Sequence, residues 1–271
     1  MPKTIEVLTP EDIVGITESV IKLTQRVAVL ESLVKPTPPT LPLESTYKLK
    51  LDVNFNNGIP TDKVYMQTTN TDANNQVKNR ASVVTLPWDT SKKGLKTEIF
   101  AGDRWNGSAP YPRSEALISN SVAAVEYNKE YLFRTTFSLD GNTNVSNEML
   151  TVFQIHHLGP GTIPVAVYQK EGKLQMAVRQ NINSAKWMTL ISNIEPNRKY
   201  SLDIYLKGNK ESRGYVKVMI NGVVVAEHVG QVGYLDQEIV GEVKFGGLYN
   251  YFNVTPGYFQ LITDGLRWFE K

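Results

Sequence analysis

The chain has 271 residues, 41% of them hydrophobic and 10% aromatic, which is enough apolar material for one large β domain or two ordinary ones. Its formal net charge of +2 is close to balance and argues against a dominant role in nucleic-acid binding. It has no cysteine, which excludes disulfides and thiolate metal sites, and no apolar run long enough to span a membrane. No basic segment followed by an apolar core opens the chain, so we expect no signal peptide.

Residues 10–35 carry the one clear helical pattern. Thr9 suits the N-cap, Pro10 suits the first helical position, and acidic residues follow in the first turn. The apolar residues recur in the heptad pattern of a coiled coil, at Ile13, Ile16, Val20, Leu23, Val27, Leu30 and Val34. Leu at most d positions favours a dimer, whereas Ile16 at d and Leu33 at g favour a trimer. We expect self-association through residues 10–35, as a dimer or a trimer, in preference to packing on the same chain's own domain.

A proline-rich segment, Lys35 to Pro42, follows the helix and predicts an extended, semi-rigid spacer. From about residue 46 the pattern changes to short alternating segments that turns interrupt. We therefore divide the chain into an oligomerisation helix at 1–35, a linker at 36–45 and a β domain at 46–271.

The β domain is predicted to contain roughly a dozen strands and no second long helix. Asn221-Gly222 is typical of a type I′ hairpin turn, and Glu171-Gly172 predicts another turn. These features favour one antiparallel β-sandwich or jelly roll. The clearest strands are expected at Tyr47 to Phe55, Tyr131 to Leu139, Ile163 to Gln169, Leu174 to Val178, Tyr200 to Leu206, Gly214 to Ile220 and Val223 to His228.

The segment from Thr151 to His157 alternates between apolar and polar residues, as a strand does. On a strand, Gln154 and His156 share one face, while Phe153, Ile155 and His157 share the other. An amide can bind a carboxyl group and an imidazole can take a proton near neutral pH, so the pair suits proton abstraction beside a carboxylate. A Gln-x-His strand on its own is more often a solvated face.

Two further segments carry polar groups on predicted strands. In Arg113-Ser114-Glu115-Ala116-Leu117, the residues Arg113, Glu115 and Leu117 share one face. In the segment Val243 to Asn250, the paired glycines 246 and 247 predict a bulge or a close approach of another group to the backbone. A surface ion pair and a half-buried tyrosine are the ordinary alternatives for these segments taken singly.

Taken together, these three segments resemble the motifs of the jelly-roll polysaccharide lyases, over roughly residues 50–270. Arg-Ser-Glu, then Gln-Ile-His, then a glycine-rich strand with a tyrosine are similar to the R-(S/T)-E-L-R, Q-(I/V)-H and YFKAG-(V/I)-YNQ motifs of alginate lyases and to related glucuronan and heparin lyase I-type enzymes. The resemblance implies a concanavalin-like β-sandwich jelly roll, no cofactor and no metal. It also implies catalytic roles for Arg113, Gln154, His156 and Tyr249.

The motifs also depart from the family pattern. Leu117 stands where the family has a second arginine, and one extra residue separates Lys244 from Tyr249. If Gly246 or Gly247 forms a bulge, Lys244 still faces the site; otherwise that lysine is lost. Both departures concern positive charge that would hold an acidic sugar.

The mechanism that the resemblance implies is β-elimination at a uronic acid. Gln154 and Arg113 would bind the carboxylate, His156 or Tyr249 would remove the C5 proton, and Tyr249 would protonate the leaving oxygen. The remaining residues expected to bind substrate are Glu115, Lys244, Arg104, Trp105, Tyr111 and Trp187, the last three by stacking on sugar rings.

Three functions remain open at this stage. The first is a lyase head on the fibre or spike of a virion, which would place the protein at a virion surface or outside a cell. It would contact an acidic polysaccharide, further copies of itself and other virion proteins through its N-terminus, but neither nucleic acid nor membrane. The second is a non-catalytic glycan-binding or structural head on the same fold, and the third is a secreted bacterial lyase.

Overall fold

The computed structural model describes residues 46–100, 102–105, 112–119, 121–139, 150–156, 163–181, 183–234, 239–250 and 258–271. The side chains at 239, 240, 247–250 and 258 are outside this description. The predicted coiled coil at 10–35 and the linker at 36–45 also lie outside it. Among the described residues, no helix is long and apolar enough to cross a membrane.

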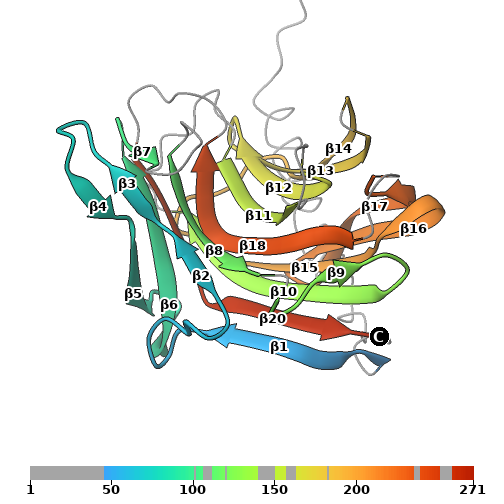
Figure 1. Cartoon of the computed structure of the whole chain (residues 1–271), viewed down its shortest axis with the longest axis horizontal. Coiled ribbons are helices and arrows are strands. Elements are labelled where there is room, and N and C mark those ends of the chain that lie inside the picture. Colours follow the sequence, from blue (N-terminus) through green and yellow to red (C-terminus); the bar gives the residue numbers. More distant parts are fainter. Residues whose placement is uncertain are drawn as a thin grey trace, which may run out of the picture. The chain divides into compact units, whose positions relative to one another are not determined.

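In the described residues, twenty strands form two large sheets and one small sheet (Figure 1). The nine-stranded sheet runs in the order β17 (Val223–Val232), β16 (Asn209–Ile220), β15 (Tyr200–Lys207), β10 (Glu130–Leu139), β19 (Tyr258–Thr263), β6 (Asp89–Phe100) and β5 (Ala81–Leu86), with β20 (Gly265–Glu270) beside β10 and β1 (Lys48–Asn54) beside β20. The eight-stranded sheet runs in the order β14 (Ser184–Ile191), β13 (Lys173–Asn181), β12 (Val165–Lys170), β11 (Leu150–His156), β18 (Ile239–Asn250), β8 (Arg113–Ile118) and β2 (Tyr65–Gln67), with β9 (Val125–Glu126) beside β18. The small sheet contains β4 (Val77–Asn79), β3 (Thr69–Thr71) and β7 (Arg104–Trp105).

The two large sheets pack face to face because each strand alternates apolar and polar residues. Along β10, Tyr131, Phe133 and Phe137 enter the core, while Arg134 lies on the outer face and pairs with Asp203 of β15. Phe133 joins the layers: its ring lies 5.0 Å from Trp268 of its own sheet and 5.5 Å from Phe153 of the opposite sheet, measured between ring centroids. The predicted antiparallel β-sandwich is therefore confirmed for the described residues.

The predicted strands match the observed ones closely, but the predicted number of about a dozen is too low. Five of the strands have only two or three residues, which is too short for an alternating pattern to appear: β2, β3, β4, β7 and β9. The hairpin turn between β16 and β17 is as predicted, since Asn221 (φ 51°) and Gly222 (φ 80°) both have the positive φ that a type I′ turn requires.

The nine-stranded sheet divides along β10. The first half of β10 pairs with β20 and its second half with β19, so two consecutive strands of the chain share one neighbour. A cavity of about 240 Å³ lies at this division, lined by charged residues that include Asp52, Lys92, Arg134, Asp264 and Arg267. In the described part of the chain, β1 has β20 as its single strand partner.

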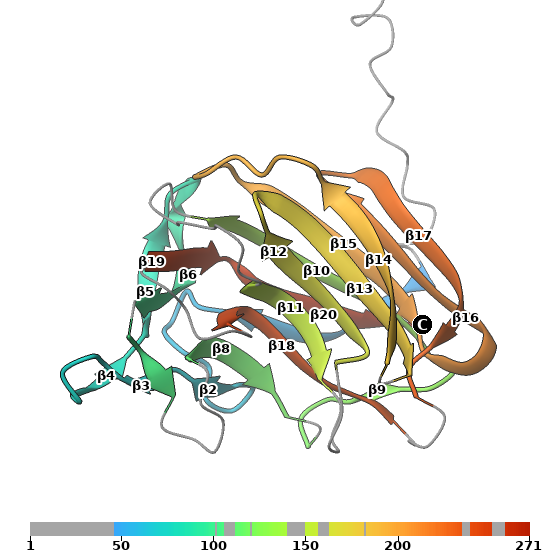
Figure 2. The ribbon, with the colours of Figure 1, turned by 90° about the horizontal axis from the view of Figure 1, so that it is seen from above.

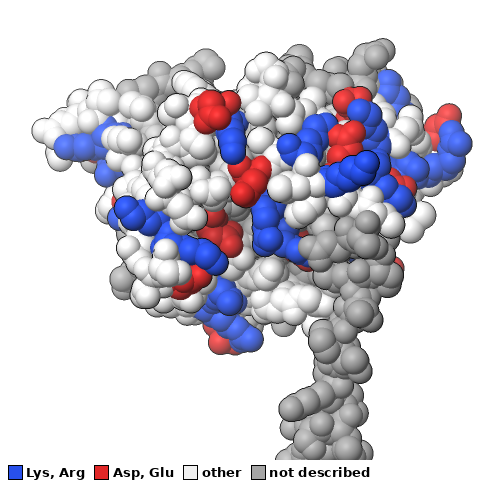
Figure 3. Space-filling view, turned by 90° about the horizontal axis from the view of Figure 1, so that it is seen from below, with Lys and Arg blue, Asp and Glu red and all other residues white. Residues whose placement is uncertain are grey.

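Lys, Arg, Asp and Glu side chains intermingle on the side of β1 and β20 (Figure 3). In the nine-stranded sheet, to which β1 and β20 belong, Arg134 pairs with Asp203 and Lys217 with Glu227. Charges of both signs therefore lie close together on this side of the described domain. The ribbon of the eight-stranded sheet, the other large sheet, is seen from above in Figure 2.

Candidate functional site

Strand β8 presents Arg113 and Glu115 on the outer face of the eight-stranded sheet. Ala116 and Ile118 point the other way into the core, so the alternation predicted for this segment is confirmed. Glu115 is only 2% exposed, although its carboxylate is charged. A buried charge needs partners of opposite sign and hydrogen-bond donors, and the neighbouring strands supply both.

Strand β11 supplies Gln154 and His156 to the same face, while Phe153 and Ile155 enter the core as predicted. Gln154 is 1% exposed and its Nε2 donates to Glu115 Oε2 at 2.7 Å. His156 ends the strand, is half-buried, and lies opposite Glu242 of β18.

Strand β18 carries a bulge, which brings Lys244 to the site. Between Phe245 and Leu248 the strand has one more residue than β8 opposite it, and Gly246 adopts a φ of +59°. The bulge also explains the glycine: a Cβ at position 246 would lie 2.4 Å from Thr263 Cγ2 of the opposite sheet. The bulge that the paired glycines predict is therefore confirmed.

The bulge also corrects the face on which two residues lie. In a regular strand, residues 244 and 249 would point to opposite sides, but here Lys244 pairs with Leu117 and position 249 pairs with Arg113, two positions of β8 that share a face. The backbone of Tyr249 thus lies beside Arg113 and Thr151.

Four side chains from three strands form one buried charge cluster, which we define as Arg113, Glu115, Gln154 and Lys244. Lys244 Nζ donates to Glu115 Oε1 at 3.3 Å, and Arg113 Nε lies 3.3 Å from the same oxygen. Lys244 is 3% exposed. Two cations thus surround one carboxylate, so the cluster carries a formal excess of one positive charge.

Gln67 of β2 extends the cluster. Its Oε1 accepts hydrogen bonds from Lys244 Nζ and from Arg113 Nη1, both at 3.2 Å. In contrast, Gln154 Oε1 is buried and has no hydrogen-bond partner among the described residues. A buried acceptor without a donor is costly, so a ligand that donates a hydrogen bond to it would be stabilised there.

Asn70 and Trp105 hold Arg113 in place. Asn70 binds its backbone, and Trp105 packs against its guanidinium. Asn70, fully buried on β3, accepts from Arg113 N at 3.0 Å and donates to Arg113 O at 2.6 Å, which imitates a strand pair. The guanidinium lies over the ring of Trp105, with its Cζ atom 4.3 Å from the ring centroid. These contacts fix both the position and the direction of the cation.

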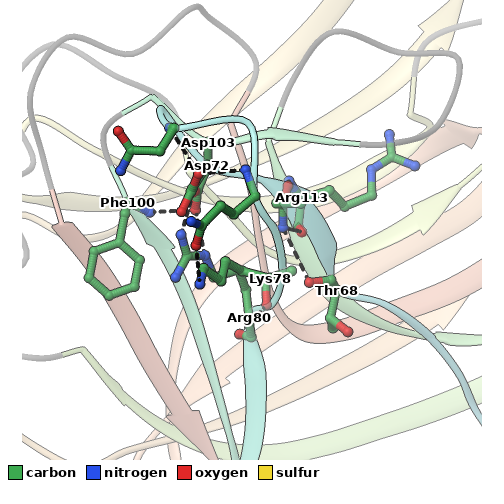
Figure 4. A network of polar contacts seen from close by, with 11 residues as sticks. Thr68, Asp72, Lys78, Arg80, Phe100, Asp103 and Arg113 are labelled. Atoms are coloured by element: carbon green, nitrogen blue, oxygen red, sulfur yellow. Dashed lines mark hydrogen bonds and ion pairs between the residues drawn. The ribbon is translucent and has the colours of Figure 1, made fainter.

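A second ion pair, between Arg80 and Asp103, is connected to the residue next to Arg113 (Figure 4). Arg80 binds Asp103 through two hydrogen bonds of 2.9 and 2.6 Å, and Asp103 also accepts from Phe100 N at 2.9 Å. Ser114, next to Arg113, donates to Arg80 O at 2.7 Å. This network therefore links the residues next to β4 and β7, Arg80 and Asp103, to the start of β8.

The other residues that the sequence predicts at the site lie outside the charge cluster or outside the described residues. Arg104 is exposed on β7 and pairs through its backbone with Thr71. Trp105 contacts Arg113, and its role in sugar stacking stays a prediction. Trp187 lies on β14, at the other side of the same sheet face. Tyr111 and the side chain of Tyr249 lie outside the described residues.

Sequence reasoning missed Gln67 and Asn70. Both lie on three-residue strands without an alternating pattern, so no signal in their own segments marks them. Their positions follow only from the pairing of β2 with β8 and of β3 with β7, which joins parts of the chain more than thirty residues apart.

The cluster's chemistry suits a carboxylate ligand. Arg113 can form a two-point contact with a carboxylate, and the excess positive charge favours an anion over a neutral group. His156, at the end of the neighbouring strand, is the group nearest in sequence to Gln154 that can exchange a proton near neutral pH.

The fold was compared with those of known proteins. No family model and no curated protein matches the sequence of this chain. Solved structures do match. An endo-β-1,4-glucuronan lyase from the fungus Trichoderma reesei has a TM-score of 0.56 and 14% identity, over 75% of this chain and 95% of the other.

Two alginate lyases of polysaccharide lyase family 7 are similar to the same extent. The A1-II′ enzyme in complex with a substrate matches with a TM-score of 0.55 and 16% identity, over 82% of this chain and 98% of the other. AlgAT5 matches with a TM-score of 0.55 and 11% identity, over 81% of this chain and all of the other. The described β domain therefore has the β-sandwich fold of these lyases, and at such low identity the likeness shows the fold alone.

Proposed function

We propose that the β domain is a polysaccharide lyase-like head that binds a glycan containing uronic acid and cleaves it by β-elimination. The observation that carries the proposal is the buried charge cluster, with its excess positive charge and the unpartnered Gln154 Oε1. The fold shared with glucuronan and alginate lyases supports it.

The first step is recognition of the uronate carboxylate. Arg113 and Lys244 would face it with positive charge, and the second N–H of Gln154 would donate to it. Gln154 Oε1 would accept a hydrogen bond from a sugar hydroxyl or from the carboxyl group once it takes up a proton. Neutralising the carboxylate makes the C5 proton more acidic, because the charge that develops on deprotonation is then stabilised.

The second step is the elimination. The C5–H bond breaks and the proton passes to the neutral imidazole of His156 or to Tyr249 in its phenolate form. The electron pair forms the C4=C5 double bond, the C4–O bond breaks, and the leaving oxygen takes a proton, which we assign to Tyr249. Atoms and charge balance without water.

The test is ultraviolet absorbance during incubation with alginate, glucuronan, heparin-type glycans and bacterial capsular polysaccharides. Elimination leaves an unsaturated uronate that absorbs, whereas hydrolysis and binding leave none. We expect a rise that His156→Ala and Tyr249→Phe each reduce by at least about 100-fold, the scale of general acid-base catalysis. Tyr215→Phe, in the other sheet, is the matched control. No rise with any glycan would refute the lyase activity.

A second candidate is a non-catalytic glycan-binding head. Leu117, which stands in place of the second family arginine, lies on the same face as the cluster, directly opposite Lys244. A site with less positive charge could hold a glycan without cleaving it. Binding to an acidic polysaccharide column with a flat absorbance trace would favour this alternative.

We further propose that residues 10–35 assemble several copies into a stalk, as on a virion fibre or spike, with the β domain as its head. The heptad pattern and the proline-rich spacer support this. Light scattering of the full chain should give two or three times the single-chain mass of 30.4 kDa, and Leu23→Asp should reduce it to that mass. A single-chain mass for the unmodified protein would refute the stalk.

A further inference from the structure

A second group of residues lies on the same outer face, at the side of β13 and β14. The register places Trp187, Ala177, Ala166 and Gln154 in one row across four neighbouring strands, which run side by side in Figure 2. Arg179 pairs with Ala185 in the next row on the same face. The alternate residues, such as Val178 and Met176, belong to the core.

Trp187 is the exposed aromatic of this row. It is 45% exposed, and its ring lies 5.6 Å from the ring of Tyr168, which is itself buried. One side of the indole is therefore held against the protein. Its neighbours in the row, Ala177 and Ala166, have small, buried side chains, whereas the indole is large and exposed. An accessible ring in this position suits stacking on the apolar face of a sugar.

Arg179 is a cation of this area that has no acidic partner among the described residues. Arg80, Arg113 and Arg134 each have an acidic partner, but no ion pair or hydrogen bond of the Arg179 side chain is found in the part of the chain that the structure describes. Its Nε atom is nevertheless buried. A buried N–H without an acceptor carries a desolvation cost, which an anionic ligand would remove.

The two side chains are near enough to act on one sugar unit. Arg179 lies diagonally across the β13–β14 pair from Trp187, and Cβ atoms in such a relation are about 7 to 8 Å apart, within reach of long side chains. Strands in a sheet are about 4.8 Å apart, which puts Trp187 about 14 Å from Gln154. That distance exceeds the size of one sugar ring.

We propose that Arg179 and Trp187 form a second subsite, in which Arg179 binds the carboxylate and Trp187 the ring of a further uronate unit of the same glycan. The inference rests on the proposed function of the charge cluster. The inference extends that function, because it defines the ligand as a polyuronate that crosses strands β11 to β14 and has acidic groups at both ends of the contact.

The experiment measures binding in the His156→Ala protein, in which turnover of the ligand is expected to be at least about 100-fold slower. Fragments of two and of six uronate units, prepared from alginate and from glucuronan, are titrated by calorimetry. We expect Arg179→Gln and Trp187→Ala each to weaken binding of a six-unit fragment by about tenfold, the effect of about 1.4 kcal/mol, and to leave binding of the two-unit fragment unchanged. Arg179→Lys should retain most of the affinity.

Lys186→Gln is the matched control, because Lys186 lies on β14 beside Arg179 but pairs with the core-facing Val178. The proposal is overturned if neither six-unit fragment binds, if the variants bind the six-unit fragment like the parent, or if they weaken both lengths equally. If Arg179→Gln fails to fold, Trp187→Ala still tests the proposal, because Trp187 is an exposed residue. Weakened binding in the variants of a protein without ultraviolet activity would support the subsite while refuting the lyase, so the two failures are distinguishable.

Discussion

Replacing Glu115 by Gln removes the one negative charge of the charge cluster and keeps its shape. Lys244 and Arg113 then lose the carboxylate that both of them contact, and removing one partner of a buried pair typically costs about 3 to 5 kcal/mol. Both cations keep Gln67 Oε1 as an acceptor at 3.2 Å, and Arg113 keeps its contact with Trp105. We therefore expect the lower end of the range, about 3 kcal/mol.

The assay is equilibrium unfolding in urea of the parent, Glu115→Gln, Lys244→Met and the double variant. Lys244→Met should cost less, about 1.5 to 2 kcal/mol, because Glu115 keeps Arg113 and the 2.7 Å hydrogen bond from Gln154. In the double variant Lys244, the buried cation that Glu115→Gln deprives of its carboxylate, is gone as well, so the cost of the double variant should fall below the sum of the single costs by about 1 to 2 kcal/mol. Strict additivity, or a loss below about 1 kcal/mol for Glu115→Gln, would refute the reasoning.

Two further predictions concern the bulge of β18 and a buried carboxyl group of the nine-stranded sheet. Gly246→Ala should lower the free energy of unfolding by about 2 kcal/mol or more, because its Cβ would lie 2.4 Å from Thr263 Cγ2 at a φ of +59°; Gly172→Ala, with positive φ but open space, is the control and should cost about 1 kcal/mol. Equal losses in urea unfolding would exclude a steric role for the bulge. Burial raises the pKa of Asp264 in the folded protein, so the folded state retains this proton to higher pH than the unfolded state and stability should fall as pH rises above about 4. Asp264→Asn, which keeps an acceptor for Thr136 N, should remove part of that fall; identical stability-pH curves for parent and variant would contradict the prediction.

Local alternation made much of the sandwich predictable. The segments of β10, β11 and β15 alternate over seven or more residues, so their strand state and their core faces follow directly from the sequence. The same rule placed Gln154 with His156 and Arg113 with Glu115. Whether Lys244 faces the site depended on a bulge. Two glycines indicate such a bulge, but only the strand register establishes it.

What escaped prediction depends on pairing between distant segments. Asn70 holds Arg113 from a three-residue strand, and Gln67 bridges two cations from another. Arg179 is similar: its own strand is evident in the sequence, but its place in the row beside Trp187 follows only from the register between β13 and β14. Periodicity gives the face on which a residue lies, and only the fold gives its neighbours.

The pairing of β1 with β20 has a consequence for how this domain forms. β1 opens the described chain, yet its strand partner in the described part contains Gly265–Glu270, near the last residue of the sequence. The backbone hydrogen bonds of β1 with β20 can therefore form only after β20 has reached its place. The chain between the two strands, which their pairing closes into a loop, includes nearly the whole sandwich. Contacts of such wide sequence separation slow folding. β1 should accordingly be among the last segments to gain protection from hydrogen exchange during refolding, and it should gain that protection together with β20.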